Sequence, residues 1–376
     1  MKLLVLAQTP PPLHGQSAMV QAMVEGLPAR GIALHHVNLR LSRDAADIGR
    51  WRPAKIFATL ACALRAIAAR FRRRCDTLYY VPAPPGKRGA LYRDWLLLAL
   101  CRPFFPRLIL HWHAVGLGEW LEREANAAER AITRALLGRA DLAIVLAEPL
   151  RDDAGRLQPR RVAVVPNGIP DPGAPTPAPA GPPFHALFLA AGSEEKGLFL
   201  AAEAVIEANR EHADDDATPA FVLTAAGPFT DAATAARWRQ LAEKHPGVLR
   251  HAGVAGEAEK RRLFAQSHAL LFPTHYAAEG LPLVAIEALA HDRPVIATEW
   301  RGLPAIVSGE VGILVPPREV QVLAAALRHL RAAPPRAGVC RDRFLRHFTI
   351  DAHLAALHRS LSSVDSSAPA VARPPA

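Results

Sequence analysis

Short hydrophobic runs alternate with amphipathic stretches along most of the chain. Residues 2–8 are apolar at nearly every position, which is typical of a strand buried on both faces of a parallel sheet. In the next stretch, 17–27, apolar residues recur at helical spacing after Ser17, the expected N-cap, and Gly31 ends the pattern. Because this alternation repeats along the chain, it predicts an α/β protein with doubly wound parallel sheets.

The alternation forms two series, separated by a proline-rich segment. In the first series we expect strands at residues 2–8, 33–39, 77–81, 107–113 and 141–147. In the second series we expect strands at residues 186–190, 221–226, 248–251, 269–272, 295–297 and 312–315. A chain of 376 residues is too long for one ordinary core, so we predict two similar domains. Ligands bind outside the carboxyl ends of such strands, so facing edges would share one site.

The expected boundaries follow the composition of the chain. One domain covers residues 1–169 and the other 184–345, and the proline-rich segment 170–183 between them is expected to be a stiff extended linker. A helix at 346–361 is expected to return to the first domain. Residues 362–376 are rich in Ser, Ala and Pro, so we expect a disordered tail.

The sharpest local pattern lies in residues 273–304. Pro282 suits the first position of a helix over 283–290, and a helix N-terminus offers free N–H groups to an anion such as a pyrophosphate. Glu279 precedes this helix and Glu287 lies within it, and carboxylates accept hydrogen bonds from sugar hydroxyls. From the two glutamates alone, the favoured interpretation is structural: Glu279 is a helix-start acid stabilised by the helix dipole, and Glu287 is a solvated surface acid.

The wider segment carries a family resemblance. From Glu279 it reads EGLPLVAIEALAHDRPVIAT, which resembles the E-x7-E signature of the retaining glycosyltransferases of family 4, whose members have the GT-B fold. Further stretches resemble the family's conserved loops and strand ends in the same order, at residues 9–17, 107–116, 165–169, 193–197 and 225–228. The resemblance therefore covers nearly the whole chain and implies two Rossmann-like domains facing across a cleft.

The resemblance implies a role for each matching residue. Glu279 would contact the transferred sugar, Lys196 would neutralise the departing diphosphate, and His113 would lie near the sugar and the acceptor. The implied donor-binding residues are Gly15, Gln16, Gly197, Gly227, Gly280, Leu281, Pro282 and Glu287, the last of them at the ribose. By the same resemblance, the first domain presents the acceptor and the second binds the nucleotide sugar. The family retains anomeric configuration and needs no metal and no cofactor beyond the donor.

Two positions depart from the family pattern. The family often has an arginine about five residues before the lysine, and this chain has Ala191 there. A lysine alone provides a point charge rather than a fork for two phosphate oxygens, so some cationic help is missing or comes from elsewhere. His291 and Asp292 replace the more usual cysteine and glycine after the helix.

The net charge of +10 is concentrated in the first half of the chain. Residues 51–74 combine arginines with Ile56, Leu60, Leu64, Ile67 and Phe71 on one helical face. We favour packing of this face on the sheet, and the alternative is contact with an anionic membrane. The candidates for contact with an acceptor or a membrane are Arg72, Arg73, Arg74, Lys87 and Arg88.

Several other classes of site find little support. The chain has neither GxxxxGK[ST] nor GxGxxG, and its helices lack the interleaved aromatic residues of single-strand nucleic-acid binders, so we expect no nucleic-acid partner. Asp214–Asp216 contain a D-x-D, but a solvated loop explains them better than a metal site. His111 and His113 lack a third ligand by spacing, so we expect no metal.

The family resemblance therefore implies a retaining, metal-independent hexosyltransferase. It would move a sugar from a nucleotide-diphosphate sugar to a glycan or lipid-linked acceptor in the synthesis of a cell-surface polysaccharide or glycolipid. The alternatives are a non-catalytic nucleotide-sugar-binding protein and another GT-B enzyme, such as an epimerase. The four cysteines do not have the spacing of a metal site, and no apolar run reaches about 20 residues. We therefore predict a cytoplasmic protein, and a location at the inner face of the cytoplasmic membrane is an open alternative.

Overall fold

The computed structural model describes residues 1–39, 53–86, 88–210 and 219–365. Lys87, the D-x-D at Asp214–Asp216 and the tail from residue 366 lie outside the described residues. The chain divides into two compact units. The N-terminal unit comprises Met1–Asn167 together with the chain from Ile350 onward, and the C-terminal unit comprises Gly168–Thr349.

The N-terminal unit is built on a parallel sheet of six strands in the order β2-β1-β3-β4-β5-β6. The strands are β1 (Lys2–Ala7), β2 (Ala33–Asn38), β3 (Thr77–Tyr80), β4 (Arg107–His111), β5 (Leu142–Val145) and β6 (Val162–Val164). All four residues of β3 and of β5 are buried, as expected for parallel strands covered on both faces. Strand β1 therefore has β2 on one side and β3 on the other, which is a topological switch point.

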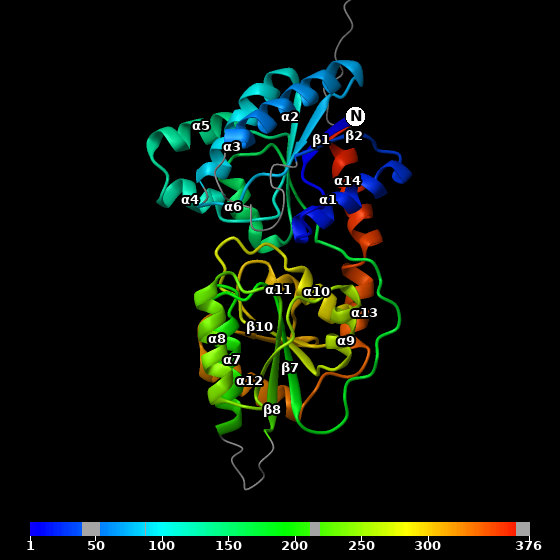
Figure 1. The fold of residues 1–376 in the computed structure, drawn as a ribbon. Coiled ribbons are helices and arrows are strands. Elements are labelled where there is room, and N and C mark those ends of the chain that lie inside the picture. The colour runs from blue at the N-terminus through cyan, green and yellow to red at the C-terminus, as the bar shows by residue number, and fades with distance from the viewer. Residues whose placement is uncertain (40–52, 87, 211–218, 366–376) are drawn as a thin grey trace, which may run out of the picture. The chain divides into compact units, whose positions relative to one another are not determined.

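Helices cover both faces of this sheet. They are α1 (Gly15–Gly26), α2 (Pro53–Arg72), α3 (Arg88–Cys101), α4 (Leu117–Arg123), α5 (Ala127–Leu137), α6 (Arg151–Gly155) and α14 (Ile350–Asp365). Figure 1 shows α1 and α14 on one face and α2, α3 and α5 on the other. Helix α5 begins with a reciprocal cap, in which Asn126 and Glu129 each accept the other's backbone N–H.

Helix α14 comes from the far end of the sequence but belongs to the N-terminal unit. Leu354, Leu357 and Leu361 are at most 5% exposed and pack in one core with Leu3 and Val5 of β1. The helix extends to Asp365, beyond the boundary at 361 that the sequence suggested.

The C-terminal unit contains a second parallel sheet of six strands, in the order β12-β11-β10-β7-β8-β9. These strands are β7 (Phe184–Leu189), β8 (Phe221–Ala226), β9 (Leu249–His251), β10 (Ala269–Phe272), β11 (Val295–Thr298) and β12 (Gly312–Val315). The switch point lies at β7, because β8 pairs with one of its edges and β10 with the other.

The helices of this unit also lie on both faces of its sheet. They are α7 (Leu198–Arg210), α8 (Ala232–Lys244), α9 (Glu257–Ala265), α10 (Leu283–Ala290), α11 (Leu303–Ile306), α12 (Val320–Ala332) and α13 (Val339–His347). Figure 1 shows α7, α8 and α12 on one face and α9, α10 and α13 on the other.

The proline-rich segment is fastened to the C-terminal unit rather than suspended. Arg293, 2% exposed, donates from Nη2 to the carbonyl oxygens of Thr176 and Pro177, at 2.8 and 3.2 Å. Arg341 forms an ion pair with Asp171, in which Nη2 donates to both carboxylate oxygens. A buried guanidinium requires such acceptors, because its charge loses hydration on burial. These contacts fix the path of the segment.

Some local expectations need correction. His14, not Ser17, is the N-cap of α1: its Nδ1 accepts the Ser17 N–H, while the Ser17 hydroxyl accepts the His14 N–H. Pro282 is the N-cap of α10 rather than its first helical residue. Asp292 adopts φ 57°, a left-handed conformation that glycine usually takes, and its carboxylate accepts the backbone N–H of Gly338 at 2.7 Å.

We expect Leu357→Ala to lower the free energy of unfolding of the N-terminal unit by about 2–5 kcal/mol, because the truncation leaves a cavity in its core. Urea unfolding of the full chain measures this loss. Leu64→Ala, the same substitution at a position of α2 that is 68% exposed, is the matched control and should cost within about 0.5 kcal/mol. Equal losses in both variants would contradict the assignment of α14 to this core.

Candidate functional site

The site residues of the C-terminal unit follow three adjacent strands. Lys196 and Gly197 lie in the loop after β7, Gly227 follows β8, and Glu279 and Gly280 lie in the loop after β10. Since β8, β7 and β10 are neighbours in the sheet, these loops meet at one edge, beyond the carboxyl ends of the strands at the switch point. This edge is where an open α/β sheet binds its ligand.

An ion pair joins the first and third loops. Nζ of Lys196 lies 2.7 Å from Oε2 of Glu279, although the two residues are 83 positions apart in the sequence. The side chain of Glu279 is 8% exposed and that of Lys196 is 23% exposed. A charge-assisted hydrogen bond this short in a largely desolvated place fixes both side chains.

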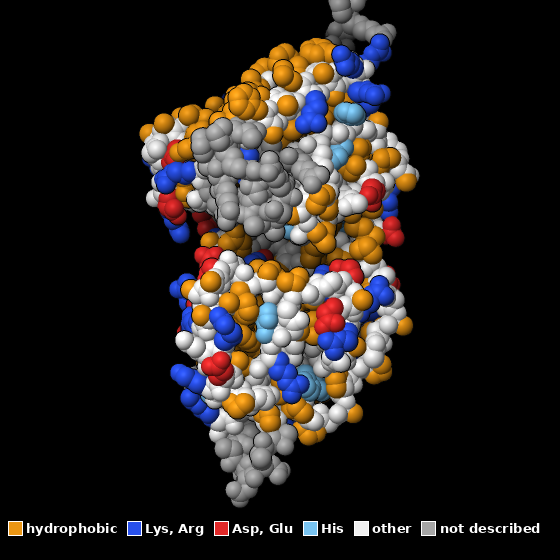
Figure 2. All heavy atoms as spheres, in the orientation of Figure 1, with side chains coloured by type: hydrophobic (Ala, Val, Ile, Leu, Met, Phe, Trp, Pro, Cys, Tyr) orange, Lys and Arg blue, Asp and Glu red, His pale blue; other side chains and the backbone are white. Residues whose placement is uncertain are grey.

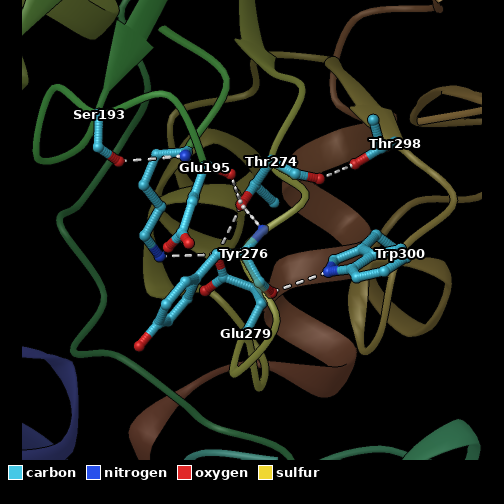
Figure 3. Close-up of polar contacts among 8 residues, drawn as sticks. Ser193, Glu195, Thr274, Tyr276, Glu279, Thr298 and Trp300 are labelled. Atoms are coloured by element: carbon cyan, nitrogen blue, oxygen red, sulfur yellow. Dashed lines mark hydrogen bonds and ion pairs between the residues drawn. The ribbon is translucent and has the colours of Figure 1, made fainter. Parts of the chain in front are cut away.

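Neighbouring groups hold the Glu279 carboxylate in place. Oγ1 of Thr274 lies 3.0 Å from Oε2 of Glu279, the oxygen that also receives Lys196. The backbone of the same turn is closed by the Glu279 N–H, which donates to the Tyr276 carbonyl. Trp300 donates its indole N–H to that carbonyl as well, at 2.9 Å (Figure 3). The carboxylate therefore stands on a rigid turn, which suits a group that must meet a ligand in one orientation.

The loop that carries Lys196 is fastened on both sides. The backbone N–H of Lys196 donates to Oγ of Ser193, and the carbonyl of Glu195 accepts the His275 N–H at 2.8 Å. Nζ of Lys196 also lies 4.7 Å from the centre of the Tyr276 ring, within cation–π range. The ammonium is thus held by Glu279 on one side and by an aromatic face on the other.

Two glycines allow these loops to approach each other. Gly197 has φ +83°, and a Cβ there would lie 2.2 Å from the carbonyl oxygen of Pro273. Gly227 has φ +129°, and a Cβ there would lie 1.9 Å from the carbonyl oxygen of Ala190. Side chains are excluded at both positions by conformation and by space, so both glycines are required by the fold of the loops.

Glu287 has a lysine partner of its own. It forms a separate ion pair with Lys260 of α9, whose Nζ lies 2.9 Å from Oε1 of Glu287 and 3.1 Å from a carboxylate oxygen of Glu257. The Glu287 side chain is 19% exposed. Glu287 is thus not a freely solvated acid, and each of the two glutamates has its own lysine partner.

The turn that leads into α10 is buried. Gly280, Leu281 and Pro282 are all buried, and a Cβ on Gly302 would lie 2.3 Å from the Gly280 carbonyl oxygen. The start of α10 is therefore packed against the loop after β11. Ala191, which replaces the family's arginine, is exposed and contributes no charge.

The N-terminal unit gathers histidines at the carboxyl end of β4. The rings of His111 and His113 lie 4.2 Å apart, centre to centre, and Nδ1 of His111 forms a short hydrogen bond with the Tyr79 hydroxyl. His353 of α14 is stacked 6.5 Å from His111. Its Nδ1 lies 2.7 Å from the Pro166 carbonyl oxygen and so carries the proton.

Burial keeps this histidine cluster neutral. Desolvation, with the nearby His353 and His14, lowers the pKa of His113 to about 3. Desolvation also lowers the pKa of His111 and of His353. Within the described residues, Nε2 of His111 and Nε2 of His353 have no hydrogen-bond partner, and no group of three side chains there could hold a metal ion.

The other expected residues of this unit occupy separate places. Gly15 and Gln16 are the first residues of α1 rather than part of a loop. Arg72, Arg73 and Arg74 are exposed at the end of α2. Arg88 is tied to Glu129, with Nε 2.8 Å from the carboxylate, so it is not a free cation.

Comparison with known proteins assigns the segment that carries the ion pair. Residues 183–332 match the family model described as "Glycosyl transferases group 1". Lys196, Gly197, Gly227, Glu279 and Glu287 all lie within this matched segment.

Curated proteins are similar to the chain over part of its length. The chain is 29% identical over 276 residues to a glycogen synthase of Mycobacterium tuberculosis, covering 68% of this chain and 64% of that protein. It is 30% identical over 154 residues to the putative colanic acid biosynthesis glycosyltransferase WcaL of Salmonella typhimurium, covering 39% of this chain and 36% of that protein. The chain thus spans less than two thirds of the length of these relatives.

Solved structures establish the fold of the whole chain as GT-B. Sucrose-phosphate synthase from Thermosynechococcus elongatus superposes with a TM-score of 0.74 at 18% identity, over 98% of this chain and all of that one. HepE from Anabaena, solved in complex with UDP-glucose, superposes with a TM-score of 0.69 at 15% identity, over 96% of this chain and all of that one. The predicted fold class is confirmed.

Several residues of the site were not evident from the sequence. Thr274 and Tyr276 lie in the same loop as Glu279, and a threonine and a tyrosine in a loop carry no specific signal. Lys260 lies on an amphipathic surface helix among other charges. His353 comes from a helix that follows the second unit, so only the three-dimensional fold places it beside His111.

We expect acid to destabilise the N-terminal unit through His113. Because its folded pKa is about 3 and the unfolded value is about 6.5, only the unfolded chain takes up the proton as the pH falls below about 6.5. Stability is therefore full above that pH and is lost as the pH falls toward 3, by about 2 kcal/mol for His113 at pH 5.

Urea unfolding at pH 7 and pH 5 measures this loss. His113→Gln should reduce the difference between the two pH values, whatever it does to stability at pH 7. His329→Gln, at an exposed position of α12, is the control and should leave the difference unchanged. A wild-type pH dependence in His113→Gln would show that the folded protein does not hold His113 in its neutral form.

Proposed function

We propose that the chain is a retaining glycosyltransferase that transfers a sugar from a nucleotide-diphosphate sugar to a glycan or lipid-linked acceptor. The observation that carries the proposal is the pair of Lys196 and Glu279 at the carboxyl edge of β7 and β10. A fixed cation beside a fixed carboxylate matches a ligand with an anionic diphosphate next to a hydroxyl-rich sugar.

The cationic half of the site would bind the diphosphate. Lys196 and Gly197 directly precede α7, a helix of 13 residues, so its first N–H groups and the lysine are close in sequence. Backbone N–H groups at a helix start and a lysine are the usual protein ligands of phosphate. Lys196 would stabilise the negative charge that develops on the leaving diphosphate, which is the largest demand of this kind of reaction.

The carboxylate half would orient the sugar. Glu279 is held by its turn and by Thr274, so accepting hydrogen bonds from sugar hydroxyls requires no reorganisation. Glu287 and Lys260 would lie at the ribose end of the donor. A ribose hydroxyl would bind a carboxylate oxygen of Glu287, which Lys260 must release. HepE, whose fold the chain shares, was solved in complex with UDP-glucose, which supports a nucleotide-sugar donor.

The N-terminal unit would present the acceptor. A neutral His113 can accept a proton or a hydrogen bond from a hydroxyl, which a permanently charged group cannot do. Tyr79 and His353 surround His111, the neighbour of His113, and so fix the orientation of the cluster. His113 would therefore position the acceptor or the sugar. Transfer in this scheme needs no metal ion.

A panel of UDP- and GDP-sugars, screened by thermal shift, identifies the donor, because a bound ligand raises the melting temperature by mass action. With that donor, we expect Glu279→Gln and Lys196→Met each to lower the transfer rate by about 100-fold or more. The matched controls, Glu243→Gln and Lys244→Met on the exposed surface of α8, should keep the wild-type rate.

The anomeric configuration of the product, read by NMR, tests the retaining outcome. Wild-type transfer in Glu279→Gln would contradict the site. Donor binding without transfer or hydrolysis would indicate the alternative, a nucleotide-sugar-binding protein without turnover, for which the missing arginine at Ala191 is the specific observation.

A further inference from the structure

The buried face of helix α2 consists of small residues, and several of its large apolar residues are exposed. The buried positions are Thr59, Cys62, Ala63, Ala66 and Ala69. The sequence had favoured packing on the sheet of the face with Ile56, Leu60, Leu64, Ile67 and Phe71. Leu60 and Ile67 are half-buried, but for the other three the prediction is wrong: Ile56, Leu64 and Phe71 are 44%, 68% and 63% exposed. The small residues let α2 lie close to β1, β2 and α3, which leaves the large apolar face outside.

The exposed apolar residues form a continuous stripe. Phe57 is 73% exposed and precedes Leu64 and Phe71 at intervals of seven residues, so the three side chains point in one direction. Two exposed or half-buried alanines, Ala61 and Ala68, lie between them on the same face. At about 1.5 Å per residue the stripe is about 21 Å long.

Phe104 extends the stripe at one end. Its ring lies 6.0 Å from that of Phe71 and it is 41% exposed. Arg70 donates from Nε to the Phe104 carbonyl at 2.8 Å, so the extension is fixed in place. Isolated exposed apolar residues are common, but a contiguous row on one helix is typical of a binding surface.

The charge around the stripe has one sign. Residues 53–74 contain no Asp or Glu, while Arg65 and Arg72 are exposed on one flank of the stripe. Arg73 and Arg74 follow at the end of the helix and are exposed too. Figure 2 shows hydrophobic side chains gathered along the outer edge of this unit, over α2, with Lys and Arg side chains beside one end.

We propose that the outward face of α2 docks on an anionic lipid bilayer. An apolar stripe flanked by arginines enters the interface between headgroups and acyl chains, while the guanidinium groups contact lipid phosphates. The absence of acidic residues from 53–74 favours this occupant over a protein, because a protein partner's mixed charges gain little from a face of one sign. No helix among the described residues is long and apolar enough to span a bilayer, so the contact would be peripheral.

The proposal is separate from the proposed catalytic activity, because α2 carries none of the residues assigned to transfer. Docking would hold the N-terminal unit, which we expect to present the acceptor, at a lipid surface. A lipid-linked acceptor is the one that would gain from this placement, and that step alone rests on the proposed function.

Flotation of the full chain with vesicles tests the docking. We expect binding to vesicles of phosphatidylcholine with about 30 mol% phosphatidylglycerol to exceed binding to pure phosphatidylcholine by about tenfold or more, and to weaken with salt. The triple variant Phe57→Ser/Leu64→Ser/Phe71→Ser should lose about tenfold or more of this binding. Val254→Ser, at an apolar residue of the C-terminal unit that is 74% exposed, is the matched control and should bind as wild type.

A second variant separates charge from apolar contact. Arg72→Gln/Arg73→Gln/Arg74→Gln should bind anionic vesicles more weakly and lose part of the salt dependence. Unfolding curves should be unchanged in both variants, since the replaced side chains are exposed. Wild-type vesicle binding by the Ser triple variant would overturn the proposal. So would equal binding to neutral and anionic vesicles, or a vesicle-free dimer of wild type that the Ser variant abolishes.

Discussion

The contact between Lys196 and Glu279 is the constraint on which the C-terminal site depends. It joins loops that follow β7 and β10, which are far apart in the sequence and adjacent in the sheet. The loops can approach only because Gly197 has no side chain to strike the Pro273 carbonyl. Burying the Glu279 carboxylate without a cation beside it would be costly. The geometry of the two loops and the opposite charges on them therefore support each other.

The strand pattern, the two domains and the position of Glu279 could be predicted because they depend on local features. Continuous apolar runs identify parallel strands, and a carboxyl end of a strand locates a ligand site. The partner of Glu287 could not be predicted, because Lys260 belongs to another helix and ordinary charge patterning gives no contact. The cap at His14 was missed because a histidine is an uncommon N-cap, and only the observed Nδ1 contact with Ser17 shows it.

The prediction of which face of α2 is buried was wrong for a different physical reason. Its apolar residues recur with helical spacing, which shows that they share a face but not which neighbour the face meets. The residues of α2 that are fully buried are small ones, such as Cys62 and Ala66, while Phe57, Leu64 and Phe71 remain outside. In the same unit, α14 closes the core and brings His353 beside His111. One unit therefore combines a neutral histidine cluster with an apolar, basic surface, which suits presentation of an acceptor held at a lipid interface.

A double-mutant cycle on nucleoside-diphosphate affinity tests most directly whether Lys196 and Glu279 act as one site. Calorimetry on wild type, Lys196→Met, Glu279→Gln and the double variant gives the coupling between the two positions. The account predicts a large loss of affinity in Lys196→Met and a coupling energy of about 0.5–3 kcal/mol. Wild-type affinity in Lys196→Met, or losses that add without coupling, would contradict it.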